Sequence, residues 1–278
     1  MKYIKFSIKN TFLFVYLKKI NIFDTFNNNI TARLIMTYKF LPLILFCVFS
    51  FKPLNRADVE KNVILKTDPK LIVTNAKTTL ETKCKFFYRT IDANDLSLPR
   101  FDSFLAAFKG YEQLKSQGKI TNEILTVIDF SLSSTEERMW VIDMKKQKVI
   151  LKSLVAHGRN SGVKYATNFS NENESYKSSL GFYLTGEVYQ GKHGLSLRLD
   201  GIEYGINDKA RDRAVVIHGA DYVSKKLARA QGYIGRSQGC PAVPYEIHKK
   251  LIQAIKDKSC IFIYHPSRNY VAKSKLVS

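Results

Sequence analysis

Hydrophobic and polar positions in residues 97–278 follow two different periods along the chain. Apolar residues recur every three to four positions between Pro99 and Gly118, where Pro99 suits a first helical turn and Gly118 a helix end. A second helical stripe runs from about Tyr245 to Lys256. Between the two helices, and once after the second, the period shortens to about two, which predicts strands at Ile124–Phe130, Met139–Met144, Val149–Val155, Phe182–Tyr189, Leu195–Leu199, Ala214–Ile217 and Ile261–Tyr264. The pattern therefore predicts a mainly β domain with packing helices.

Two segments lack a clear period. Residues 51–96 are mixed and rich in Lys and Thr, and we expect a loosely ordered segment that approaches the domain at 97–278. Residues 158–179 form a polar stretch that is long for a simple connection. This stretch is either a lid or binding loop, or a solvated surface insertion. The chain shows no internal repeat.

Residues 1–50 are typical of a leader. We expect residues 1–35 to be a mis-annotated extension, translation to start at Met36, and residues 36–50 to be a signal peptide. Its apolar core, FLPLILFCVF, is too short to span a bilayer comfortably, and Pro42 argues against a buried helix. The prediction is export to the periplasm or cell envelope, with membrane contact only during export.

The net charge is +20, and residues 1–52 account for only +7 of it, so the remaining chain is strongly basic. Such a field attracts polyanions, but the chain lacks zinc-finger spacing, a helix-turn-helix pattern and basic runs interleaved with aromatics. We therefore expect no nucleic-acid partner. Metal-ligand spacings are also missing, so neither a metal nor a cofactor is expected.

Three cysteines remain once Cys47 leaves with the signal peptide, so at least one thiol is unpaired. Cys260 lies in an apolar run typical of a buried strand, and Cys84 has no evident role. Cys240 stands out because it follows Gly235-Arg-Ser-Gln-Gly239 in a glycine-bounded turn. A strand at Ala214–Ile217 delivers His218, whose imidazole is a candidate base for the thiol.

The residues around Cys240 suggest how a carbonyl substrate would be held. Gly239 leaves room for the substrate, and its N–H is a candidate oxyanion donor together with that of Cys240. Pro241 has no N–H to offer, whereas the Gln238 amide is a further candidate. The alternative is that the cysteine and histidine are simply core residues. His157 and His193 also precede glycines, so composition alone does not single out His218 as the base.

Residues from about Phe101 to Pro266 resemble the murein L,D-transpeptidase catalytic-domain family, in a branch with a Gly-Arg-Ser-x-Gly-Cys-Pro-Ala motif. The matching text includes residues 175–183, 189–194, 210–213, 218–222 and 235–243. The resemblance implies a β-sandwich or barrel-like catalytic domain over 97–278. It also implies that Cys240 attacks the third residue of a peptidoglycan stem peptide, and that carbapenems acylate the same thiol.

Two departures from the broader family limit what the resemblance transfers. The usual Ser-His-Gly-Cys is here Ser237-Gln238-Gly239-Cys240, and Pro241-Ala242 replaces the Arg or Asn common after the cysteine. Arg236 is a candidate partner for a substrate carboxylate, because guanidinium binds such groups bidentately, and the alternative is that it is a surface arginine. Further candidate substrate contacts are Ser237, Gln238, His193 and Lys192.

Three functions remain open on the sequence alone. The first is an L,D-transpeptidase that forms cross-links between stem peptides. The same dyad with water as acceptor would be an L,D-carboxypeptidase or endopeptidase. A non-catalytic wall-binding module is the third. The sequence identifies neither the acceptor nor the oligomeric state.

Overall fold

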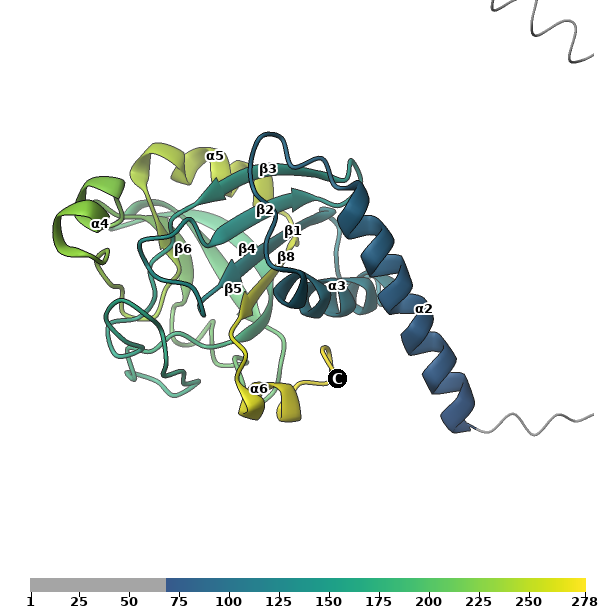
Figure 1. The fold of residues 1–278 in the computed structure, drawn as a ribbon. Coiled ribbons are helices and arrows are strands. Elements are labelled where there is room, and N and C mark those ends of the chain that lie inside the picture. Colours follow the sequence, from purple (N-terminus) through teal and green to yellow (C-terminus); the bar gives the residue numbers. More distant parts are fainter. Residues whose placement is uncertain (1–68) are drawn as a thin grey trace, which may run out of the picture. The chain divides into compact units, whose positions relative to one another are not determined.

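The computed structural model describes residues 69–278, which Figure 1 shows in colour. The predictions of an extension at 1–35 and a signal peptide at 36–50 lie outside the described residues, as does the part of the approach segment before residue 69.

The described part of the chain is mainly β, with one eight-stranded, barrel-like sheet in the order β3-β2-β1-β8-β4-β5-β6-β7. Strands β1–β2, β2–β3, β4–β5, β4–β8 and β5–β6 pair antiparallel, whereas β1–β8 and β6–β7 pair parallel. The strands are β1 (Ile124–Asp129), β2 (Met139–Asp143), β3 (Lys148–Ser153), β4 (Gly181–Gly191), β5 (Gly194–Gly201), β6 (Val216–Gly219), β7 (Ala242–Val243) and β8 (Cys260–Tyr264). All seven predicted strands are confirmed within a few residues; the two-residue β7 was not predicted.

The core lies around β1 and β8, whose residues are all buried. Their nearly continuous apolar sequences fit strands covered on both faces. α3 (Phe101–Ser116) contacts β1 and β8, and α5 (Tyr245–Ile255) contacts β1, β5 and β6. Both helices were predicted, and Gly118 follows α3 with a φ of +68°.

The expectation of a loosely ordered segment at 51–96 is wrong for residues 69–90, which form α2 (Pro69–Thr90). The apolar stripe of its second half is short, but it packs on α3 rather than facing solvent. The Phe87 ring lies 5.5 Å from the ring of Phe108, and buried Cys84 joins the same cluster. Two short helices, α4 (Lys225–Gln231) and α6 (Arg268–Lys273), were not predicted.

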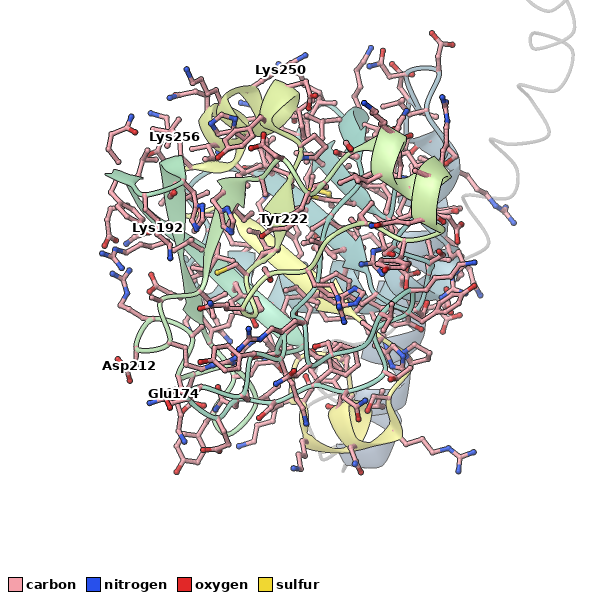
Figure 2. All side chains as sticks on the ribbon, turned by 90° about the vertical axis from the view of Figure 1, so that its left-hand side faces the viewer. Glu174, Lys192, Asp212, Tyr222, Lys250 and Lys256 are labelled. Carbon is pink, nitrogen blue, oxygen red and sulfur yellow. The ribbon has the colours of Figure 1, made fainter. Side chains whose placement is uncertain are left out.

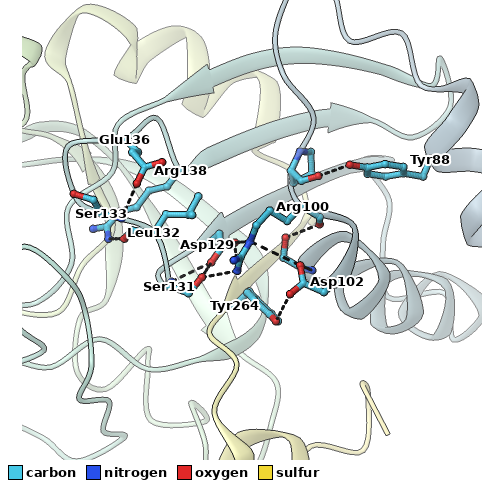
Figure 3. Close-up of polar contacts among 12 residues, drawn as sticks. Tyr88, Arg100, Asp102, Asp129, Ser131, Leu132, Ser133, Glu136, Arg138 and Tyr264 are labelled. Atoms are coloured by element: carbon cyan, nitrogen blue, oxygen red, sulfur yellow. Dashed lines mark hydrogen bonds and ion pairs between the residues drawn. The ribbon is translucent and has the colours of Figure 1, made fainter.

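A polar cluster joins the start of α3 to the ends of β1 and β8 (Figure 3). Arg100, just before α3, lies 3.1 Å from the buried Asp129 carboxylate and donates to Ser131 Oγ at 2.6 Å. The Tyr264 hydroxyl donates to Asp102 Oδ2 at 3.1 Å. Because Asp129 is fully buried, its carboxylate needs such partners: Arg100 supplies the opposite charge, and the Ser131 N–H and hydroxyl donate further hydrogen bonds.

Candidate active site

A tight turn from Ser237 to Pro241 presents Cys240 just before β7. The Ser237 hydroxyl donates to Cys240 O at 2.6 Å and accepts from Gly239 N at 3.0 Å. Gly239 has a φ of +123°, a conformation that other residues rarely adopt. Ser237 is only 6% exposed, and its hydroxyl is used on both sides of the turn. The structure thus shows Ser237 holding the nucleophile turn, and its contact with a substrate stays a prediction.

Pairing between β6 and β7 brings Cys240 next to the strand that carries His218. The parallel register pairs His218 with Ala242. Continued two residues back along both segments, the same register places Val216 beside Cys240. The Val216 N–H accordingly donates to Cys240 Sγ at 3.4 Å, and the thiol lies 3.7 Å from Ala214 O. His218 was expected at a strand end, but it lies inside β6 because β7 extends the sheet beside it.

His218 is held in the tautomer that a base requires. Its side chain is 3% exposed, and Nδ1 lies 2.9 Å from Gly219 O, so Nδ1–H donates and Nε2 keeps its lone pair. Burial lowers the pKa of His218, and the positive charges of His193, Lys192 and His248 lower it further, against the Gly219 hydrogen bond. The imidazole is therefore neutral at neutral pH.

The thiol of Cys240 is also neutral at rest. Burial raises its pKa, which the Val216 N–H and the charges of Arg213 and Lys192 partly offset. The hydrogen-bond partners of Sγ within residues 69–278 are Val216 N and Ala214 O, and His218 is not among them. The electrostatics thus favour a thiol that passes its proton to the base during attack.

His193 lies against His218. The β4–β5 hairpin turn places the His193 ring 4.4 Å from the His218 ring, centroid to centroid, at 22° between planes. Lys192 precedes it and is exposed (Figure 2). His248 of α5 is 5% exposed, because α5 packs toward β6. Three cationic or titratable side chains thus surround the candidate base.

His157, the alternative base, has a structural role. Arg138 Nη2 donates to His157 Nδ1 at 2.7 Å, and His157 Nε2 lies 3.2 Å from Gly162 O. Burial and the Arg138 charge lower the pKa of His157 to about 4. Arg138, itself fully buried, also donates to the carbonyl oxygens of Val155 and Leu132. With both ring nitrogens engaged, His157 has no lone pair to offer Cys240.

The polar stretch 158–179 lies against the nucleophile turn. The Ser178 hydroxyl accepts from Gly158 N at 3.0 Å and donates to Gly239 O at 3.1 Å. Arg236 is exposed and donates to Gly162 O at 3.3 Å, so its guanidinium supports this loop. Gln238 is exposed beside the turn. Residues 158–179 therefore line one side of the candidate site. The sequence had left open whether this stretch is a lid or binding loop, or a surface insertion.

Arg213 is the residue of this site that sequence reasoning did not select. Its guanidinium contacts the loop beside Gly239, although the motif at 210–213 drew attention only as a match to the family. Residues 69–278 hold no cluster of three or more His, Cys, Asp or Glu side chains that would suit a metal ion. None of the helices in this described part is both long and apolar enough to cross a membrane.

Comparison with known proteins gives a family match and distant structural similarities. Residues 97–264 match a family described as L,D-transpeptidase catalytic domain. No curated protein matches the chain. Among solved structures, an L,D-transpeptidase from Mycobacterium smegmatis shares 14% identity at a TM-score of 0.32, over 51% of this chain and 59% of that one. The chain thus spans less than two thirds of that structure's length.

Two further structures are similarly distant. The helical cell shape determining protein Pgp2 from Campylobacter jejuni shares 14% identity at a TM-score of 0.35, over 57% of this chain and 56% of that one. An L,D-transpeptidase from Stackebrandtia nassauensis shares 12% identity at a TM-score of 0.32, over 59% and 67%.

Proposed function

Because the chain belongs to the L,D-transpeptidase catalytic domain family, we propose that it is an exported cysteine acyltransferase acting on peptidoglycan stem peptides. In this proposal Cys240 is the nucleophile and His218 the base. One observation carries it: the strand beside the Cys240 turn holds an imidazole whose Nδ1–H is fixed on Gly219 O, which leaves Nε2 free to take a proton.

The reaction would proceed in two acyl transfers. As His218 Nε2 removes the Cys240 proton, Sγ attacks the carbonyl carbon of the third stem residue. The bond to the terminal D-residue breaks, its amine leaves with the proton from His218, and a thioester remains. The amine of a second stem then attacks the thioester, forming the cross-link and returning the proton to the thiol. The first transfer requires the Cys240 thiol to exchange its contacts with Val216 N and Ala214 O for one with His218 Nε2.

Backbone geometry supports Cys240 N–H as the main oxyanion donor. The Gly239 N–H is taken by Ser237 Oγ and would have to open to serve a substrate. Pro241 has no N–H, and the Cys240 N–H has no acceptor within residues 69–278. Donors aimed at the developing charge are worth about 3–4 kcal/mol of the barrier each.

Exposed polar side chains around the turn are the proposed substrate contacts. Gln238 and Lys192 are exposed. Arg236 would bind a substrate carboxylate by giving up its hydrogen bond to Gly162 O. His193 instead contacts the base directly, so we assign it to the catalytic environment. Export, with a mature chain beginning near residue 51, remains a proposal that N-terminal sequencing of protein from its host would test.

Mass analysis of muropeptides after incubation with the purified protein tests the function. New cross-linked dimers, missing with Cys240→Ala and His218→Ala, are the expected result. Shortened stems without dimers would overturn transfer in favour of an L,D-carboxypeptidase or endopeptidase. Unchanged muropeptides that nevertheless bind the protein would indicate a wall-binding module and overturn the enzymatic proposal.

A further inference from the structure

Arg213 carries a positive charge that is satisfied by neutral oxygens alone. Its guanidinium donates four hydrogen bonds, to Ser170 O (2.9 Å), Ser179 Oγ (2.5 Å), Ser175 Oγ (3.3 Å) and Lys177 O (2.6 Å). Arg213 is half-buried and forms no ion pair within residues 69–278; Glu172 acts on its charge without pairing with it, because the Glu172 carboxylate pairs with Lys209. A half-buried cation without a carboxylate is costly unless a negative charge develops nearby.

The contrast with Arg211, two residues earlier, is direct. Arg211 is exposed and lies 2.8 Å from a carboxylate oxygen of Glu187, with a second carboxylate partner in Asp200. Its charge is therefore neutralised at the surface, whereas that of Arg213 is not.

The Arg213 guanidinium lies beside the residue that precedes the nucleophile. A Cβ built on Gly239 would lie 3.3 Å from Arg213 Nη2 and 2.9 Å from Lys177 O. The guanidinium and the loop carbonyl thus occupy the space that a side chain at 239 would need.

We propose that Arg213 is a positioning residue that fastens loop 170–179 beside Gly239 and stabilises the Cys240 thiolate as it forms. The inference rests on the proposed role of Cys240 as nucleophile. The positive charge of Arg213 opposes the rise that burial imposes on the pKa of Cys240. Loop order and thiol ionisation are thereby linked through one side chain.

Other groups face the same thiol and must be distinguished from Arg213. The charge of Lys192, in the β4–β5 hairpin, also acts on the thiol, but Lys192 is exposed and its charge is screened by solvent. His218 on β6 is neutral at neutral pH, and burial raises the pKa of Tyr222 to about 12, so it is neutral as well. Of these four groups, Arg213 is the one that is both permanently charged and partly buried. Electrostatic effects are stronger where solvent is partly excluded.

The rate of Cys240 alkylation by iodoacetamide, followed from pH 5 to 10 by peptide mapping, tests the proposal. Alkylation reports the thiolate fraction and needs no stem peptide, so the result is independent of transpeptidation. An opposite charge nearby lowers a pKa by about one unit or more, so Arg213→Gln should slow alkylation at pH 7 about tenfold. It should also move the profile to higher pH.

Matched variants separate charge from anchoring. Arg211→Gln removes the same charge from the same segment and should leave the profile within about twofold of the wild type. Arg213→Lys keeps the charge but cannot reach all four oxygens, so the alkylation profile should recover while the loop becomes more sensitive to limited proteolysis. Ser179→Ala removes one oxygen and no charge, and the profile should stay in place.

The proposal is overturned if the Arg213→Gln profile overlays that of the wild type, or if Arg211→Gln shifts it equally. Thermal unfolding shows whether each variant is folded. If Arg213→Gln does not fold, Arg213→Lys decides: a profile displaced to higher pH despite the retained charge contradicts the electrostatic role.

Discussion

Replacement of Gly239 by alanine tests how tightly the turn before Cys240 is built. Gly239 is buried with a φ of +123°, and an added Cβ would lie 2.9 Å from the Lys177 carbonyl oxygen. That distance is shorter than real Cβ contacts, and a backbone oxygen cannot swing aside as a side-chain end can. The turn and loop 170–179 would therefore have to separate.

Two costs add in Gly239→Ala. The backbone conformation costs about 1–3 kcal/mol for a residue with a Cβ, and forcing the loop away from the turn costs about 1–2 kcal/mol more. A total of about 2–5 kcal/mol corresponds to a fall in Tm of roughly 4–20 °C for a domain of this size. Activity should fall further than stability suggests, because the same movement displaces the Cys240 N–H.

Gly232→Ala is the matched control. Gly232 caps α4 with a φ of +77°, and nothing lies within 4 Å of a Cβ built there. It therefore carries only the left-handed strain, about 1 kcal/mol, and should lower Tm by a few degrees with activity kept. Differential scanning calorimetry and muropeptide turnover measure both. Equal falls in Tm for the two variants would refute the steric part of the reasoning.

Three further predictions concern titration and reactivity. Burial lowers the pKa of His157 from an ordinary 6.5 to about 4. As the pH falls, the unfolded chain therefore takes up this proton before the folded chain does. The contribution of His157 to the free energy of unfolding is full above pH 6.5 and falls by roughly 3 kcal/mol toward pH 4. His157→Gln should flatten that fall in urea titrations, and an unchanged slope would contradict it. His193→Phe keeps a ring on His218 but removes a charge, so the acidic limb of kcat/KM should move to higher pH; a limb that stays or moves lower would count against the stacked pair. Brief alkylation of native protein should label Cys240 before the two fully buried cysteines, with carbapenem preincubation protecting it, and an earlier label elsewhere would remove it as the reactive thiol.

Much of the fold follows from periodicity, because long amphipathic and β-branched runs carry their own signal. α3 and α5 have regular stripes, and the strand pattern predicted the mainly β class. The stripe of α2 is short, and its burial depends on α3, which no local pattern reveals. β7 is two residues long, so only its pairing with β6 identifies it.

The candidate site was predictable where a motif carries its own chemistry. Cys240 and His218 were selected from a glycine-bounded turn and a preceding strand, and the pairing of β6 with β7 brings the turn that holds Cys240 beside the strand that holds His218. The contacts of Ser237 and Arg213 were not predictable. The Ser237 hydroxyl bonds within its own turn, whose geometry no spacing in the sequence reveals, and Arg213 contacts a loop distant in the sequence. The same holds for the pKa directions, which burial sets.

Trapping the acyl-enzyme tests the central claim most directly. The protein is mixed with a tetrapeptide stem without acceptor, quenched in acid within seconds, and measured by intact-mass spectrometry followed by peptide mapping. We predict a mass increase equal to the acyl part of the stem without its terminal residue, located on Cys240, released by hydroxylamine and missing from Cys240→Ala. An adduct on Cys84 or Cys260, or one that persists in Cys240→Ala, would contradict the account.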